Sequence, residues 1–172
     1  FRLTDPVSSY IPEFQDWKDQ AGDVSTIRIQ HLLTHTSGLP PYAPVEALAR
    51  KYGSPNPQGL LEHICQVKRD FEPGTDFQYS CLNYITLQHI IQRCTGVSLR
   101  EYAQRCIFTP LGMSHTDYLP VGENLDRWGN QIAPTTRQPD GSVLRGQVHD
   151  PLARVMNGGI SGNAGVFSTV DD

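Results

Sequence analysis

The chain lacks the patterns that mark several classes of protein. No apolar run approaches the roughly 18–20 residues that a membrane-spanning helix needs, and there is no internal repeat and no low-complexity tract. The formal net charge is −4 and the basic residues are scattered, so the sequence offers no basic face for nucleic acid. No Cys-x-x-Cys pair occurs, which leaves a zinc or redox site of that kind without support.

The length and composition of the chain favour one globular domain. A chain of 172 residues can bury about two-thirds of its unfolded surface, which suffices for a hydrophobic core. Hydrophobic residues make up 38% of the chain, and 15 glycines and 13 prolines predict many loops and turns.

The four cysteines are even in number, which is compatible with disulfides. Their positions favour another interpretation, because Cys65, Cys94 and Cys106 fall on helix-like patterns and Cys81 lies in a short motif discussed below. We expect buried thiols, with a disulfide as the alternative.

The first helix is expected to begin at Ser25 or Thr26, whose hydroxyls suit an N-cap, because apolar residues follow at helical spacing. Gly38 is placed to end this helix in a left-handed cap. The segment before it, residues 1–24, is expected to be mostly irregular.

Periodicity predicts four further helices, and residues 117–157 carry the turn formers of long loops with short strands. Val166 and Phe167 are expected in a buried strand. The expected helices are 44–52, 57–69, 85–94 (ended by Thr95 and Gly96) and 99–106.

Two motifs carry a resemblance to a known family. Residues 31–40 read HLLTHTSGLP, and residues 79–81 read YSC. The first resembles the signature of the serine β-lactamase and penicillin-binding-protein-like hydrolases, which include class C β-lactamases, D-alanyl-D-alanine peptidases and related esterases. The second lies where that family keeps Tyr-x-Asn, and residues 1–14 and 165–172 are also similar to the family.

The resemblance implies an α/β β-lactamase/transpeptidase-like fold, here mostly its helical lobe with part of the central antiparallel sheet. It also implies a Ser-x-x-Lys nucleophile, yet Lys18, Lys51 and Lys68 all lack a Ser three residues before them. We therefore expect residues 1–172 to be an internal fragment of a single domain, without its nucleophile segment and C-terminal strands. A complete protein that has lost its catalytic ends is the alternative.

In the parent enzyme the resemblance gives Tyr79 a catalytic role, as a base or proton relay beside the nucleophile; otherwise it is an ordinary half-buried tyrosine. Cys81 stands where the family has Asn and is expected to contact substrate. A thiol cannot hydrogen-bond two partners as an amide does, so Cys81 puts β-lactam hydrolysis in doubt. Cys81 as a nucleophile is a weaker alternative. Asn83 is expected to point into the following helix and not to replace the missing amide.

Tyr42 is expected either at the rim of the acyl pocket or as a surface aromatic. His31 and His35 have the i, i+4 spacing of a zinc pair but lack the Glu of a metalloprotease, and the resemblance makes His35 structural. Ser37 is expected to cap the turn, since it does not follow a strand as a nucleophile elbow requires.

In the later part of the chain, a His149–Asp150 hydrogen bond is expected to fix a loop. Gly162 to Gly165 either shape the pocket or allow tight backbone packing.

The functional prediction is a serine hydrolase that forms an acyl-enzyme with an ester, a peptide or other amide, or a β-lactam; the 172 residues alone are expected to be inactive. The alternatives are a non-catalytic ligand-binding module on the same fold and a purely structural or interaction domain. No cofactor, metal or nucleic-acid partner is implied, and only the resemblance suggests a periplasmic or secreted location.

Overall fold

The computed structural model describes residues 1–128 and 131–172, and these fall into two compact units. Unit 1 contains Phe1–Pro44 and Gln58–Gly96, and unit 2 contains Val45–Pro57 and Val97–Asp172. Both combine helices with two-stranded antiparallel sheets, as an α/β chain should. The residues at 129–130, within the predicted loop region 117–157, lie outside the described residues.

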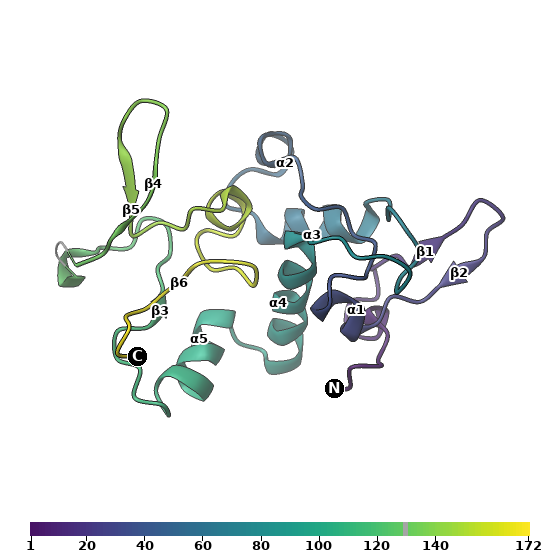
Figure 1. Ribbon diagram of the computed structural model, residues 1–172, viewed down its shortest axis with the longest axis horizontal. Coiled ribbons are helices and arrows are strands. Elements are labelled where there is room, and N and C mark those ends of the chain that lie inside the picture. Colours follow the sequence, from purple (N-terminus) through teal and green to yellow (C-terminus); the bar gives the residue numbers. More distant parts are fainter. Residues whose placement is uncertain (129–130) are drawn as a thin grey trace. The chain divides into compact units, whose positions relative to one another are not determined.

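Unit 1 is built around the helix α4, Cys81–Thr95 (Figure 1). Ser80 is its N-cap and accepts a hydrogen bond from the backbone N–H of Leu82 at 3.2 Å. Gly96 ends the helix, as the sequence predicted, and its φ of 73° is left-handed. The helix begins four residues before the predicted start at residue 85, and most of its first ten residues are buried.

The helix α1, Ile29–Leu33, packs against α4 in the same unit. The predicted caps are wrong, because Arg28 is the N-cap and its backbone N–H donates to Nδ1 of His31 at 3.2 Å. The Ser25 hydroxyl donates to the Glu72 carboxylate at 2.5 Å, across 47 residues of sequence. The Ser25 hydroxyl therefore bonds to a residue far away in sequence and does not cap the helix, although the local pattern predicted that it would.

Gly38 does have the predicted left-handed conformation, with a φ of 76°, but not as the cap of α1, which ends at Leu33. The glycine is required by a close approach, because a Cβ here would overlap the carbonyl oxygen of Phe71. The Gly38 carbonyl accepts the backbone N–H of Asp70 at 2.7 Å. Gly38 thus connects its own loop to the loop at residues 70–71.

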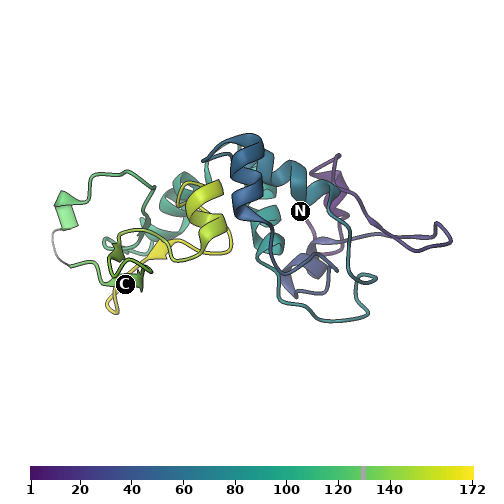
Figure 2. The same ribbon diagram turned by 90° about the horizontal axis from the view of Figure 1, so that it is seen from above.

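The rest of unit 1 includes α3, Pro57–Gln66, which ends three residues before the predicted boundary at 69. The buried Arg69 guanidinium donates to backbone carbonyls at the end of α3, among them Ile64 and Val67. The short antiparallel hairpin of β1 and β2 extends away from the helices of this unit, as both ribbon views show (Figures 1 and 2). The first segment is otherwise irregular, as predicted, with η1 at Val7–Ser9, β1 at Trp17–Lys18 and β2 at Val24–Ser25.

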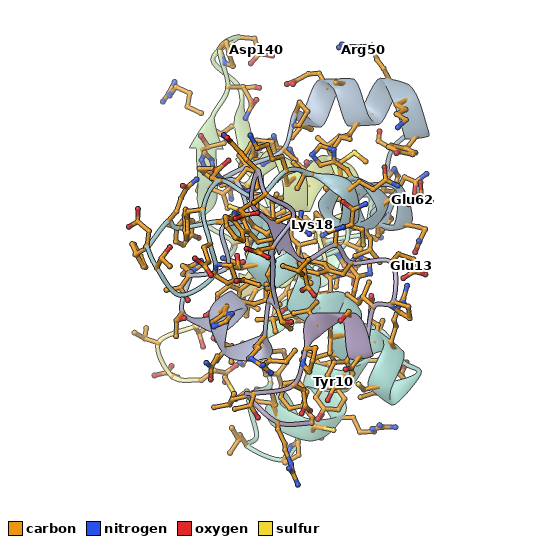
Figure 3. The ribbon with its side chains drawn as sticks, turned by 90° about the vertical axis from the view of Figure 1, so that its right-hand side faces the viewer. Tyr10, Glu13, Lys18, Arg50, Glu62 and Asp140 are labelled. Carbon is orange, nitrogen blue, oxygen red and sulfur yellow. The ribbon has the colours of Figure 1, made fainter. Side chains whose placement is uncertain are left out.

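Unit 2 begins with α2, Val45–Tyr52, which agrees closely with the predicted helix 44–52 and contacts the π-helical turn η4, Leu152–Met156. The α-helix predicted at 99–106 is shorter than expected, because α5 ends at Ala103 and the π-helical turn η2, Gln104–Phe108, follows it. Asp140 lies at the tip of the β4–β5 hairpin (Figure 3). The remaining elements are α5 Leu99–Ala103, η2 Gln104–Phe108, β3 Asp117–Tyr118, η3 Asp126–Trp128, β4 Pro134–Arg137, β5 Val143–Arg145, η4 Leu152–Met156 and β6 Val166–Phe167.

Two burial predictions are wrong. Val166 in β6 is 49% exposed, because this two-residue strand pairs with β3 alone in the described sheet. Cys94 and Cys106 are exposed: Cys94 is the last residue but one of α4, and Cys106 lies in η2, Gln104–Phe108, between the exposed Arg105 and Ile107. All four cysteines are thiols, and Cys65 is the one that is buried as expected.

The search for membrane spans covers the described residues. None of the helices in that part of the chain has the length and apolar character needed to cross a bilayer.

Candidate active site around Tyr79

Tyr79 lies in unit 1, one residue before the N-cap of α4, with its side chain 59% exposed. Its backbone neighbours are both held by one residue. The N–H of Gln78 donates to the His35 carbonyl at 3.0 Å, and the N–H of Ser80 donates to Nδ1 of the His35 ring at 3.2 Å. An exposed phenol is therefore carried on a fixed backbone.

The rings around Tyr79 form an aromatic cluster made of His35, Phe77, Tyr79 and Tyr84. The His35 ring is their common neighbour, with centroid distances of 4.6 Å to Tyr79, 5.3 Å to Tyr84 and 6.2 Å to Phe77. The Tyr84 hydroxyl donates to the Leu33 carbonyl at 3.1 Å, which ties α4 to α1. Phe77 is 66% exposed and Tyr79 is 59% exposed, so the cluster presents aromatic surface to its surroundings.

A buried polar network lies beneath this cluster. Asn83, fully buried on α4, contacts Nδ1 of His35 through Nδ2 at 3.0 Å and accepts the Ser37 hydroxyl through Oδ1 at 2.5 Å. The backbone N–H of Leu39 in turn donates to the Ser37 hydroxyl at 3.1 Å. The expectation that Asn83 points into the following helix is wrong, because Asn83 itself lies in α4 and its partners lie 46 and 48 residues earlier.

Cys81 is the first residue of α4 and is partly exposed. Its backbone N–H donates to the Pro41 carbonyl at 3.1 Å, and the Ser80 hydroxyl donates to the Pro40 carbonyl at 2.6 Å. These bonds bring the segment that carries Tyr42, which is 40% exposed, next to the segment of Tyr79 and Cys81. The structure therefore gathers the backbone of the three predicted site residues at the N-terminus of one helix.

The two histidines of the HLLTHTSGLP motif have different surroundings. His31 lies in α1, while His35 follows the end of the helix with a φ of 58°, so they do not share one helical face. Burial lowers the pKa of both imidazoles, with the Arg28 charge adding to the effect at His31. In the described ranges, 1–128 and 131–172, no group of three or more His, Cys, Asp or Glu side chains could hold a metal ion.

Ser37 is 1% exposed and its hydroxyl is engaged in the buried network, which agrees with the predicted structural role. Sequence reasoning missed the part played by Asn83. The N-cap Ser80 did carry a signal, since a serine before a run of helix formers is typical of an N-cap.

In unit 2, several hydrogen bonds hold the loop around residues 146–150. Asp150 accepts the backbone N–H of Ala153 at 2.8 Å, and Arg154 donates to the carbonyls of Val148 and His149 at 2.8 Å each. Gly165 has a φ of 116°, and a Cβ there would lie 2.5 Å from the Gly159 carbonyl oxygen, so the predicted tight backbone packing is confirmed at this glycine.

Unit 2 also contains a hollow of about 490 Å³ that the sequence did not predict. Trp128 and Phe167 contribute aromatic wall, His115 and His149 contribute polar groups, and Val148 contributes apolar wall. Its residues come from β3, β4, β6 and the loops between them, which are too far apart in sequence for a local pattern to reveal.

Comparison with protein families adds the deciding observation. The model of the family described as Beta-lactamase matches residues 1–172, the whole chain. The chain belongs to this beta-lactamase family. The family is one of serine hydrolases, so the resemblance seen in the HLLTHTSGLP and Tyr-Ser-Cys motifs is confirmed.

Curated relatives of this beta-lactamase family member include two bacterial proteins. The chain is 34% identical over 184 residues to a Bacillus subtilis (strain 168) protein named "N-acetylmuramyl-L-alanine amidase", covering 96% of the chain and 41% of the relative. It is 35% identical over 183 residues to an Escherichia coli (strain K12) protein named "Putative D-alanyl-D-alanine carboxypeptidase", covering 98% and 42%. The chain thus spans about two-fifths of the length of the curated relatives it matches.

Solved structures confirm the β-lactamase/transpeptidase-like fold. FmtA from Staphylococcus aureus matches with a TM-score of 0.70 at 22% identity, over 98% of this chain and 42% of that one. EstCE1, described as a hydrolase with promiscuous acyltransferase activity, matches with a TM-score of 0.69 at 23% identity, over 99% and 49%. The predicted fold class, a partial α/β domain of this type, is therefore correct.

Proposed function

We propose that residues 1–172 are the central part of a longer serine hydrolase that forms an acyl-enzyme, and that Tyr79 handles a proton in that reaction. The observation that carries the proposal is the placement of Tyr79: the residue is exposed, while the backbone N–H groups of its two neighbours, Gln78 and Ser80, both donate to His35. A group that moves protons must be accessible and held in place, and Tyr79 is both.

The nucleophile would come from a Ser-x-x-Lys segment outside these residues, because no such segment occurs within them. In this proposal the serine hydroxyl attacks the acyl carbon while Tyr79, with the lysine, takes its proton. The leaving group departs with a proton, and water then releases the acyl group. The 172-residue chain alone would accordingly be inactive.

The substrate class follows from two considerations. The names of the relatives, an amidase and a putative carboxypeptidase, support an amide or peptide substrate, and the family acts on small acyl substrates such as peptides or β-lactams. The resemblance to related esterases adds esters to the proposal. Cys81 occupies the family's Asn position at the start of α4, beside Tyr79. Because a thiol is a weak hydrogen-bonding group, it favours ester or peptide substrates over β-lactams.

The test uses the full-length protein that carries these residues, with a p-nitrophenyl ester as substrate. Tyr79→Phe keeps the ring and removes only the hydroxyl, so kcat/KM should fall by about 10²–10⁴, the usual size of a proton-transfer contribution. Tyr84→Phe is the matched control, since its ring also contacts His35 but its hydroxyl is bonded to the Leu33 carbonyl. The control should stay within about threefold.

Wild-type kinetics for Tyr79→Phe would reduce this tyrosine to a packing residue and refute the proposed mechanism. A second assay addresses the fragment itself: the 172-residue chain should not hydrolyse nitrocefin or p-nitrophenyl acetate above background. Turnover by this chain that disappears on substitution of Ser37 or Cys81 would overturn the proposal.

A non-catalytic binding module is the second candidate, favoured by the lack of Ser-x-x-Lys within the chain. The same kinetic experiment separates the two, because a binding module would retain affinity for an acyl ligand but show no turnover in the full-length protein.

A further inference from the structure

His35 contacts the Tyr79 segment in three ways. Its carbonyl accepts the N–H of Gln78, its ring nitrogen Nδ1 accepts the N–H of Ser80, and its ring lies 4.6 Å from the Tyr79 ring with an interplanar angle of 39°. One residue therefore accepts the backbone N–H groups of both residues next to Tyr79, Gln78 and Ser80, and also contacts the Tyr79 ring.

The backbone conformation of His35 makes these hydrogen bonds possible. Its φ of 58° lies in the left-handed region, which few residues other than glycine adopt and in which histidine is enriched. In this conformation the carbonyl and the ring are both directed to the chain at 78–80. The strain is offset by the bonds that the conformation allows.

The directions of the hydrogen bonds fix the protonation state of the ring. The Ser80 N–H can only donate, so Nδ1 of His35 carries a lone pair and not a proton. Asn83 then presents its Nδ2 donor to the same atom, which agrees with the acceptance of the Ser37 hydroxyl by Asn83 Oδ1. The Ser37 hydroxyl is itself committed, because it accepts the Leu39 N–H while it donates to Asn83.

We propose that His35 is a positioning residue for Tyr79: with Nδ1 unprotonated it locks the 78–80 backbone in the productive position, and protonation at Nδ1 releases it. This inference rests on the proposed catalytic role of Tyr79 and adds to it a residue that acts through the tyrosine.

Protonation would be disruptive because two N–H donors already point at Nδ1. A proton there removes the only lone pair that both donors use, so the Ser80 and Asn83 bonds are lost together. The titratable groups that face the ring are the phenols of Tyr79, in the loop before α4, and of Tyr84, on α4 itself. Burial lowers the pKa of His35 below its usual value, which favours the neutral ring that accepts both hydrogen bonds.

The kinetic test compares three substitutions of His35 in the full-length protein. His35→Asn suits the left-handed φ and offers an oxygen acceptor near the position of Nδ1, whereas His35→Phe keeps a ring and His35→Gln keeps polarity without an acceptor at that position. We expect Phe and Gln to lower kcat for a p-nitrophenyl ester by about 10- to 100-fold with little change in KM, the scale of a small misplacement. Asn should stay within about threefold of wild type.

His31→Asn serves as the control, because His31 also accepts a backbone N–H through Nδ1 but does so at Arg28. It should leave kcat unchanged. If His35→Phe does not fold, as judged by circular dichroism, the His35→Gln variant decides. Equal losses for Asn, Phe and Gln would show a general packing role and overturn the inference, as would wild-type kcat in folded Phe or Gln variants.

The dependence of kcat on pH separates this role from a packing role, because a residue that only packs would not change it. Wild-type kcat should fall on acidification below the pKa of His35, and His35→Asn should lack that acidic limb. An unchanged acidic limb in His35→Asn contradicts the proposed release.

A direct measurement separates this inference from the proposed function. With ¹⁵N-labelled histidine, Nδ1 of His35 should resonate as an unprotonated nitrogen at neutral pH. A protonated Nδ1 would overturn the inference. If Tyr79→Phe keeps wild-type kinetics, the proposed function fails whatever the spectrum shows. If Tyr79→Phe loses activity while folded His35→Phe and His35→Gln do not, only the inference about His35 fails.

Discussion

The buried His89 should make the free energy of unfolding depend strongly on pH. It lies on the central helix α4, is 7% exposed, and its Nε2 has no hydrogen-bond partner in the described structure. Burial, and secondarily the Arg93 charge, lowers the pKa of the His89 imidazole from 6.5 to about 4. The unfolded chain therefore binds a proton at a higher pH than the folded chain does.

The sign follows from proton linkage. Above about pH 6.5 both states carry a neutral ring and the full stability is present; as the pH falls towards 4 only the unfolded state is protonated, so folding weakens. At about 1.36 kcal/mol per pH unit, the gap between 6.5 and about 4 amounts to about 3 kcal/mol, lost in full below pH 4. That is a large share of the 5–15 kcal/mol that typically separates folded and unfolded states.

The measurement is a set of urea unfolding curves at pH 7, 6, 5 and 4 for wild type, His89→Leu and His115→Gln. His89→Leu removes the titrating group and the unpartnered atom, so its loss of stability between pH 7 and pH 4 should be smaller than that of wild type by about 3 kcal/mol. His115 is exposed, and its substitution should leave the wild-type pH dependence intact. Parallel curves for wild type and His89→Leu, or an NMR titration of folded His89 with a midpoint near 6.5, would refute the reasoning.

Two further predictions concern particular contacts. Gly38→Ala should lower the free energy of unfolding by about 2 kcal/mol or more, because it combines a positive φ with overlap of the Phe71 carbonyl. Gly96→Ala, with a φ of 73° and open space around its Cβ, should lose only about 1 kcal/mol in the same urea assay; equal losses would disprove the close approach. Arg100→Lys should lower the stability of unit 2 by about 1–3 kcal/mol, because Nε and Nη2 of Arg100 donate to both carboxylate oxygens of Asp117, at 2.9 and 2.6 Å, and lysine cannot form this fork. A thermal midpoint of Arg100→Lys equal to wild type would contradict that expectation.

The sequence predicted the helices well where the signal is local. The helix 44–52, the core of 57–69 and the stop of α4 at Gly96 follow from apolar spacing and from a glycine that can adopt a positive φ. The same methods misassigned Ser25 and Gly38, because their decisive partners, Glu72 and Phe71, lie 47 and 33 residues away in sequence.

The candidate site divides in the same way. Tyr79 could be singled out because its motif resembles a family signature, and the family is confirmed. The buried network of Ser37, Asn83 and His35 could not be found, because it depends on which side chains the folded chain brings together across almost 50 residues. Burial at single positions failed because an apolar pattern does not show which residues the fold covers: Cys94, Cys106 and Val166 fit apolar patterns but are exposed.

The His35 grip on residues 78–80 has a consequence for protein engineering. Since the tyrosine loop takes its backbone position from the turn at 35–39, a chimera that transplants only residues 77–83 into another scaffold would carry the tyrosine without its support. The two segments form one exchangeable cassette, joined by Asn83, and have to be moved together. Recombination libraries of such hydrolases should therefore place their crossovers outside residues 35–83, or exchange both segments in the same step.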